Sequence, residues 1–221
     1  MEHVETFSPS QAKTLATNRL IRNTYTLLAL TLAFSAAMAG VSMVSGVPPI
    51  NPWIFLGGYF VLLALTNVFR NSGMGVVCVF ALTGFMGFTL GPILSFFLAT
   101  QNGSQLVMQA LGATAFIFFA LSAYVFISRK DFSFIGGFLF VGLLVAFLAG
   151  LAAFAFDMHT LSLAVSAAFV LLASGLILYQ TSAIVHGGET NYIMATVTLY
   201  VSLYNLFMSL LHLLRAFSGD D

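Results

Sequence analysis

The sequence predicts an all-α membrane protein with seven transmembrane helices, and three observations carry that prediction. Of its 221 residues, 60% are hydrophobic and only 6% are charged, whereas a soluble domain carries roughly 25% charged residues. Seven apolar runs approach or exceed the ~20 residues that a helix needs to cross the hydrocarbon layer of a membrane. The runs lack the apolar–polar alternation of barrel strands, so we expect helices, which satisfy their own backbone hydrogen bonds in lipid.

Short polar or proline-containing breaks separate the runs. The first break, over residues 46–52, contains three prolines, which have no backbone N–H and therefore end a helix. The first run contains Ala37-Met38-Ala39, a pattern typical of a signal-peptidase site, but it continues past that point to Val44. We therefore interpret it as a span rather than as a cleaved signal. The expected spans cover residues 25–45, 53–69, 74–99, 106–127, 133–156, 161–180 and 193–214.

The positions of the basic residues predict the orientation. The connections after the first, third and fifth runs contain no lysine or arginine, whereas six of the seven basic residues lie at the other ends: Lys13, Arg19, Arg22, Arg70, Arg129 and Lys130. Because basic loops stay in the cytoplasm, we expect a cytoplasmic N-terminus, and seven crossings place the C-terminus outside. The resulting division is a cytoplasmic tail over 1–24, a membrane domain over 25–214 and a short tail over 215–221.

The connection between the last two runs, residues 178–192, is therefore expected in the cytoplasm. Its sequence, LYQTSAIVHGGETNY, contains two adjacent glycines. We expect residues 186–189 to form the turn, because glycine adopts positive φ without a steric cost. The Glu189-Thr190-Asn191 stretch would then supply oxygen acceptors near the start of the seventh helix.

Polar side chains recur along the last run at steps of three and four, which places them on one face of a helix. They are Thr198, Ser202, Asn205, Ser209 and His212, and we call them the polar stripe. The stripe is expected to turn into the bundle, where it would supply hydrogen bonds between helices or line a hydrated path. No acid or base lies well inside any run, which weakens a transporter or pump interpretation because such groups mark ion pathways.

The third run contains closely spaced small residues and a proline. Gly87 and Gly91 are four residues apart, as in the small-xxx-small surfaces on which membrane helices pack closely. Pro92 removes one backbone donor and is expected to bend the helix. Close packing with a kink is one interpretation of these residues, and a hinge for gating is the other.

Nothing in the sequence indicates an enzyme, a cofactor or a metal site. The four histidines are scattered without ligand spacing, and the sequence contains no Ser-His-Asp arrangement, phosphate-binding loop or metalloprotease helix. The formal net charge is zero, and we expect no nucleic-acid partner.

Several segments resemble the Bax inhibitor-1 (TMBIM) family: GFTLGPIL at 87–94, ALGATAFIF at 110–118, RKDFSFIGG at 129–137 and LYVSLYNLF at 199–207. The similarity covers nearly the whole chain from residue 22 onward. It implies a bundle in which the seventh helix is central and is surrounded by the other six.

The resemblance also directs attention to four positions. In calcium-leak members of the family, a pair of aspartates couples the sixth and seventh helices and senses pH, often with a basic partner near the end of the second helix. The matching positions are Gln180, which follows Ile177-Leu178-Tyr179, and Ser202, three residues before Asn205, with Arg70 as the basic residue. Because an amide and a hydroxyl do not titrate in this range, Gln180 and Ser202 are expected to keep a hydrogen-bonded contact without the pH switch.

The segments RNTY and HGGETNYI resemble a bacterial branch of the family. This implies an inner-membrane protein that modulates the membrane-bound ATP-dependent protease FtsH as a slowly degraded substrate. We expect it to be a monomer. The polar stretch 1–24 would be an unstructured handle for the protease's unfolding motor. The alternative is a passive leak channel for calcium or protons lined by the polar stripe, although carboxylates, the usual attractants of such cations, are missing. A scaffold for another membrane protein is a third option.

Overall fold

The computed structural model describes residues 9–218, and over this range the protein is all-α. Its seven α-helices are each long and apolar enough to cross a membrane, which confirms the predicted fold class. The helices are α1 (Pro9–Val44), α2 (Pro52–Phe69), α3 (Gly73–Leu98), α4 (Gly103–Ser128), α5 (Gly136–Ala155), α6 (His159–His186) and α7 (Tyr192–Ser218), with a short 3₁₀ turn, η1 (Ser133–Ile135), before α5.

Proline and glycine set helix boundaries as the sequence predicts. Pro52 is the first residue of α2, where its missing N–H costs nothing, and the Asn51 side chain caps the helix by accepting from the Trp53 N–H. Helix α6 continues to His186, six residues beyond the expected end at 180. The residue that follows it, Gly187, has a φ of 81°, the left-handed conformation that glycine supplies at helix C-termini.

Helix α1 begins much earlier than expected. Its first residue is Pro9 rather than a residue near 25, so the part of the expected unstructured tail that the structure describes is helical. The reason is that no glycine or proline interrupts residues 10–24, and Leu20 and Ile21 pack against the core. The first eight residues of the expected tail lie outside the described residues.

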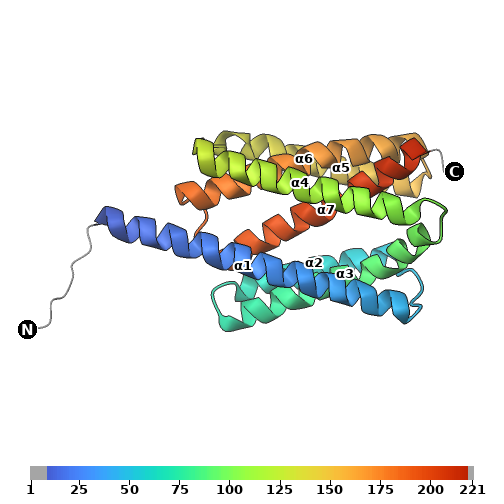
Figure 1. Ribbon diagram of the computed structural model, residues 1–221, viewed down its shortest axis with the longest axis horizontal. Coiled ribbons are helices and arrows are strands. Elements are labelled where there is room, and N and C mark those ends of the chain that lie inside the picture. Colours follow the sequence, from blue (N-terminus) through green and yellow to red (C-terminus); the bar gives the residue numbers. More distant parts are fainter. Residues whose placement is uncertain (1–8, 219–221) are drawn as a thin grey trace, which may run out of the picture.

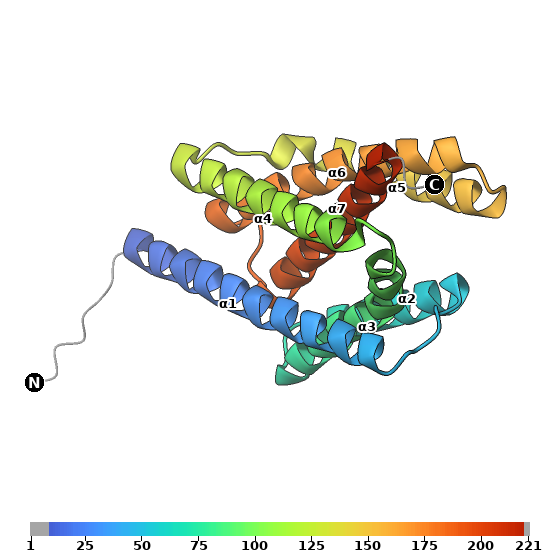
Figure 2. The same cartoon turned by 45° about the vertical axis from the view of Figure 1, so that its right-hand side comes forward.

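The helices form two layers with α7 between them (Figure 1). One layer contains α1, α2 and α3, and the other contains α4, α5 and α6; turning the molecule keeps both groups together (Figure 2). Helix α7 packs against α1, α2, α3, α4 and α6 but makes no close backbone contact with α5 within the described range. The expectation that all six helices surround α7 is therefore not confirmed, because α5 packs on the outer side of α6.

The main core lies along α7. Buried apolar side chains of α1, α3 and α6 meet those of α7 there, and the largest of them is Tyr200. By contrast, Thr66 is the one buried residue of α2, as expected for a helix whose apolar side chains face lipid. The start of α1 and the α2–α3, α4–α5 and α6–α7 connections lie at one end of the bundle (Figure 1). Arg70 belongs to the α2–α3 connection, and Arg129 and Lys130 belong to the α4–α5 connection. We call this end of the bundle the basic end.

Candidate functional site

The polar stripe of α7 is only partly joined to its neighbours. His212 is joined to α6, because its Nδ1 atom lies 2.8 Å from the Ser166 hydroxyl. The Ser202 hydroxyl instead donates to the Thr198 carbonyl of its own helix, at 2.7 Å. Among the described residues, the Asn205 and Ser209 side chains make no hydrogen bond. The stripe therefore contributes one polar contact between helices and leaves other polar groups free.

Gln180 and Ser202 are both inside the protein, with 5% and 0% of their surfaces exposed. They do not form the expected hydrogen bond with each other. Ser202 is satisfied by its own backbone, and the Gln180 Nε2 atom is buried without a hydrogen-bond partner in the described structure. The two positions are thus buried polar sites on adjacent helices rather than a bonded pair.

Arg70 is not brought to these two residues. Its side chain is exposed at the end of α2, where Nη1 donates to Asn67 Oδ1 at 3.3 Å. Its backbone carbonyl accepts a hydrogen bond from Asn191 Nδ2 at 2.8 Å. Arg70 therefore helps to hold the start of α7 through its backbone, not through its charge.

The connection between α6 and α7 contains the expected acceptors. Glu189 Oε1 accepts from the backbone N–H groups of Thr190 and Asn191. Asn191 Oδ1 in turn accepts from Ile193 and Met194, which satisfies the first free donors of α7. This agrees with the prediction that these side chains cap the seventh helix.

A second connection at the basic end was not singled out from the sequence. The Phe132 N–H donates to the Ser182 hydroxyl at 2.9 Å, and His186 Nε2 lies 3.0 Å from the Arg129 carbonyl oxygen. The Ser133 backbone N–H donates to Asp131 Oδ1 at 2.8 Å, and chiefly for this reason the pKa of Asp131 lies below its ordinary value. These contacts fasten the α4–α5 connection to α6. The available sequence signal is the spacing of Ser182 and His186, four residues apart on one helix face. The sequence analysis assigns His186 only to the turn.

Tyr200 is a central residue that the sequence analysis missed. Its hydroxyl lies 2.6 Å from the Ser35 hydroxyl of α1 and donates to the Thr83 carbonyl of α3 at 3.2 Å. A buried tyrosine hydroxyl needs such partners, and that requirement was the available signal. One side chain of α7 thus joins two helices of the first layer.

Gly87 and Gly91 lie where α3 packs closely on α1. A Cβ atom at Gly87 would overlap the Ser35 carbonyl oxygen, and one at Gly91 would lie 2.6 Å from Ser42 Cβ. Pro92 is buried, and α3 continues through it as one helix to Leu98. The arrangement supports close packing of α1 on α3, while the hinge interpretation stays a prediction.

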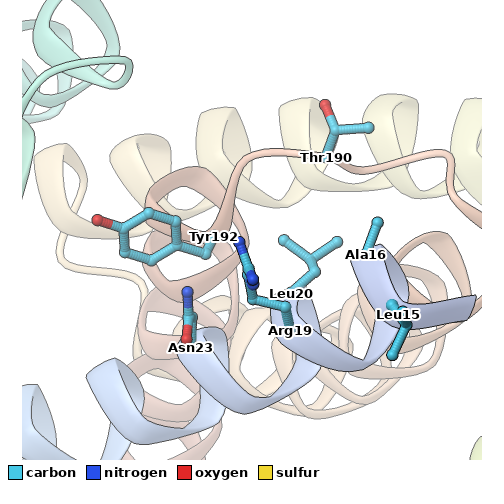
Figure 3. Close-up of a pocket in the computed structure, with 7 residues that line it drawn as sticks. All are labelled: Leu15, Ala16, Arg19, Leu20, Asn23, Thr190 and Tyr192. Carbon is cyan, nitrogen blue, oxygen red and sulfur yellow. The ribbon is translucent and has the colours of Figure 1, made fainter. Parts of the chain in front are cut away.

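Two hollows flank the first turns of α1 at the basic end. One, of about 540 Å³, lies between α1 and the α6–α7 connection, and Figure 3 shows the Arg19 side chain pointing from α1 toward Tyr192. The other, of about 450 Å³, lies on the α4 and α6 side and is lined by Arg129 and His186. Leu15, Ala16, Asn18 and Arg19 are therefore exposed beside these hollows, whereas Leu20 and Ile21 pack against the core. No group of three or more metal-ligating side chains occurs among the described residues.

Comparison with known proteins decides the family. The model of the family described as "Inhibitor of apoptosis-promoting Bax1" matches residues 17–219, almost the whole chain. The protein belongs to the Bax inhibitor-1 family. The family description names an inhibitor and one relative is named as a modulator; neither name is that of an enzyme.

Bacterial relatives in the family are similar over nearly their full length. An uncharacterized protein of Pseudomonas aeruginosa is 54% identical over 202 residues, 91% of each chain. The Escherichia coli K12 protein named "Modulator of FtsH protease YccA" is 47% identical over 220 residues, 100% of each chain. An uncharacterized membrane protein of Vibrio cholerae is 42% identical, covering 98% of this chain and 97% of its own.

Proposed function

We propose that this protein modulates an FtsH-type protease of the bacterial inner membrane and does so as a slowly degraded substrate. The observation that carries the proposal is the 47% identity, over the full length, to the E. coli protein named as a modulator of that protease. The same sequence match bears the name "Inner membrane protein YccA" in a second E. coli strain. The distribution of basic residues supports a cytoplasmic N-terminus and a periplasmic C-terminus.

The start of α1 is the segment best suited to engagement by an unfolding motor. It lies at the basic end, and Leu15 is 54% exposed with hollows on both sides of its helix. Segments with few buried contacts open locally at low free energy. A motor that grips the N-terminus would therefore unwind the first turns of α1 before it meets Leu20 and Ile21, which pack against the core.

Beyond that point the bundle opposes extraction. Pulling α1 out requires separating it from α3 at Gly87 and Gly91 and breaking the Ser35–Tyr200 hydrogen bond. In lipid, these packing contacts and hydrogen bonds are the main forces that hold helices together. A loosely held start followed by a tightly held helix is the arrangement expected of a substrate that occupies a protease for a long time.

Two deletions in the full chain test this mechanism. Removing residues 2–8 leaves α1 as it begins at Pro9, and removing residues 2–18 also removes the first turns of α1. We expect the longer deletion to lengthen the half-life in cells that contain the protease and the shorter one to have less effect. Neither should alter the half-life in cells that lack the protease. Removal of residues 219–221 is the matched control at the other terminus, and an unchanged half-life for the 2–18 deletion would overturn the handle mechanism.

The leak-channel alternative has a separate test. Gln180 and Ser202 replace titratable acids with groups that keep one protonation state between pH 5 and pH 8, and both are buried. Liposomes containing the purified protein should therefore show no pH-dependent calcium flux across that range. A steep pH-dependent flux that Gln180→Leu abolishes would favour the channel and count against our interpretation of these positions.

A further inference from the structure

The side of the bundle between α1 and α4 contains an apolar groove of about 500 Å³. It is lined by α1 over residues 32–43 and α4 over residues 107–119, with α3 and α7 behind. Helices α1 and α4 make no close backbone contact within residues 9–218, and α7 crosses between them (Figures 1 and 2). We call this the α1–α4 groove; along it the backbones of the two helices stay apart.

The groove lies within the apolar part of the chain and opens to the side. Its lining comes from the second half of α1 and the first half of α4, so it occupies the half of the bundle away from the basic end. At its edges, Leu111 is 54% exposed and Phe119 is 67% exposed. The medium at this depth is the hydrocarbon of one membrane leaflet.

Three of the four polar side chains that line the groove, those of Ser35, Thr114 and Tyr200, have hydrogen-bond partners; the fourth is Tyr204. Tyr200 bonds to Ser35 and to the Thr83 carbonyl, and the Thr114 hydroxyl donates to its own helix at 2.7 Å. A water molecule needs two to four polar partners to occupy a cavity, and these walls present few. An apolar groove of this size that stayed empty would forfeit dispersion contacts along its whole lining.

The volume decides between two apolar occupants. An α-helix about 10 Å wide that rises 1.5 Å per residue needs roughly 120 Å³ per residue, so about 500 Å³ holds only about one turn. A methylene group is similar in size to a water molecule, whose share of volume is about 30 Å³. The same space therefore accommodates roughly 16 methylenes, the scale of a single lipid chain.

We propose that the α1–α4 groove binds one acyl chain of a membrane phospholipid, which joins the two layers by hydrocarbon contact where the protein itself leaves a gap. Small residues make the room: Ala36 and Gly40 on α1 and Ala115 on α4 line the groove. A Cβ atom added at Gly40 would meet no other atom within 4 Å. The chain thus acts as a packing element of the fold rather than as part of the surrounding solvent.

Photocrosslinking with labelled lipid tests the proposal. The full-length protein is placed in vesicles of phosphatidylethanolamine and phosphatidylglycerol containing a trace of phospholipid with a diazirine on its acyl chain, and labelled residues are mapped by mass spectrometry. We expect the label to concentrate on residues 32–43 and 107–119. A second apolar groove of about 570 Å³ is lined only by α5 and α6, which pack directly on each other. It should label like the rest of the lipid-facing surface. Uniform labelling of all lipid-facing helices would overturn the proposal.

Paired variants separate a bound chain from ordinary surface lipid. Gly40→Leu combined with Ala115→Leu fills the groove, and its labelling should fall about tenfold, the change that about 1.4 kcal/mol of lost binding produces. Gly112→Leu is the control on α4, because an added Cβ there also meets nothing within 4 Å but lies outside the groove lining. Equal labelling of the filled variant and the control would overturn the proposal.

A stability measurement keeps the test independent of labelling. Stripping lipid with detergent should lower the melting temperature of the natural protein more than that of the filled variant, because leucine side chains replace the lost hydrocarbon. A filled variant that is folded in membranes but loses as much stability as the natural protein on delipidation would contradict the proposal. Capture of a polypeptide by a photoreactive residue at Phe119, in place of lipid, would instead identify a helix-docking site and overturn it.

Discussion

Helix α1 has two sides that differ in packing, and a glycine lies at each: Gly87 of α3 on one side and Gly40 of α1 itself on the other. Toward α3, the backbones approach so closely that a Cβ at Gly87 would overlap the Ser35 carbonyl. Toward α4, Gly40 faces a groove in which an added Cβ would meet nothing within 4 Å. The same residue type therefore permits backbone contact on one side and creates room on the other.

The difference shows how the two-layer arrangement is stabilised. Within the first layer, α1 and α3 rely on direct packing, which in lipid must replace the hydrophobic effect as the force between helices. Between layers, α7 supplies most of the contact, and α1 reaches the second layer at Tyr25, whose hydroxyl lies 3.4 Å from both Ser122 and Thr181. The first layer thus behaves as one packed unit, whereas the second is joined to it chiefly through α7.

The largest expected effect comes from Gly87→Ala. The added methyl group overlaps backbone atoms of α1, which can move away only by separating the helices, so we expect a loss of roughly 2–3 kcal/mol of unfolding free energy, within the usual range for overpacking. Gly40→Ala is the matched control on the open side and should stabilise the protein by up to about 0.5–1 kcal/mol, because alanine favours helix over glycine. Steric-trapping or detergent-unfolding measurements would check both. Equal effects of the two variants would break the comparison.

The next largest effect is expected from Tyr200→Phe. It removes a buried hydroxyl with partners at 2.6 Å and 3.2 Å on two helices, and should cost about 1–2 kcal/mol. Tyr25→Phe is the counterpart on the α4 side. Its hydrogen bonds are at the long end of the accepted range and half-buried, so the loss should not exceed about 0.5 kcal/mol. The same unfolding assays apply, and a larger loss for Tyr25 would mean that contact between the layers does not depend mainly on α7.

The elements predicted correctly from the sequence are those whose causes are local. Each of the seven helices needs one continuous apolar run to cross lipid. Gly187 provides the positive φ at a helix end. Glu189 and Asn191 lie just before the backbone N–H groups that they accept from. Each of these signals occupies one segment of the chain. Local chemistry was therefore sufficient for the helix count and for the turn between α6 and α7.

The features that were missed depend on residues far apart in the sequence or on continuity of a helix. Tyr200 finds Ser35 at a separation of 165 residues and Thr83 at 117, which no local pattern encodes. Helix α1 continues back to Pro9 because nothing interrupts it, although its first turns lack the apolar signal of a span. Arg70 matches a family position but lies on the surface with Asn67, so its expected meeting with Gln180 could not be judged without the structure.

Gln180 offers a smaller, oppositely directed test at the α6–α7 contact. Its buried Nε2 atom has no partner within the described structure, and an unsatisfied buried donor is destabilising. Gln180→Leu should therefore be neutral or stabilise the protein by up to about 1 kcal/mol. Gln109→Leu, on an exposed part of α4, is the control for simply adding an apolar side chain. A loss of stability specific to Gln180→Leu would show that the amide has a partner such as bound water.

The smallest expected effect concerns a tie within the second layer, where Asp131 lies in the connection between α4 and α5. The Ser133 backbone N–H lowers the pKa of Asp131 most, followed by the Ser133 side chain, with further lowering from His186 and the Ser182 hydroxyl. Because the folded pKa is below the unfolded one, the stabilisation is present above the ordinary value of about 3.9 and is lost as the pH falls through the folded pKa. Asp131→Asn should therefore lower the melting temperature slightly at pH 7, and the difference should shrink steadily as the pH falls below about 3.9. Ser133→Ala keeps the backbone donor and should have a weaker effect at pH 7. An Asp131→Asn difference that did not shrink on acidification would show that charge is not what fastens this connection to α6.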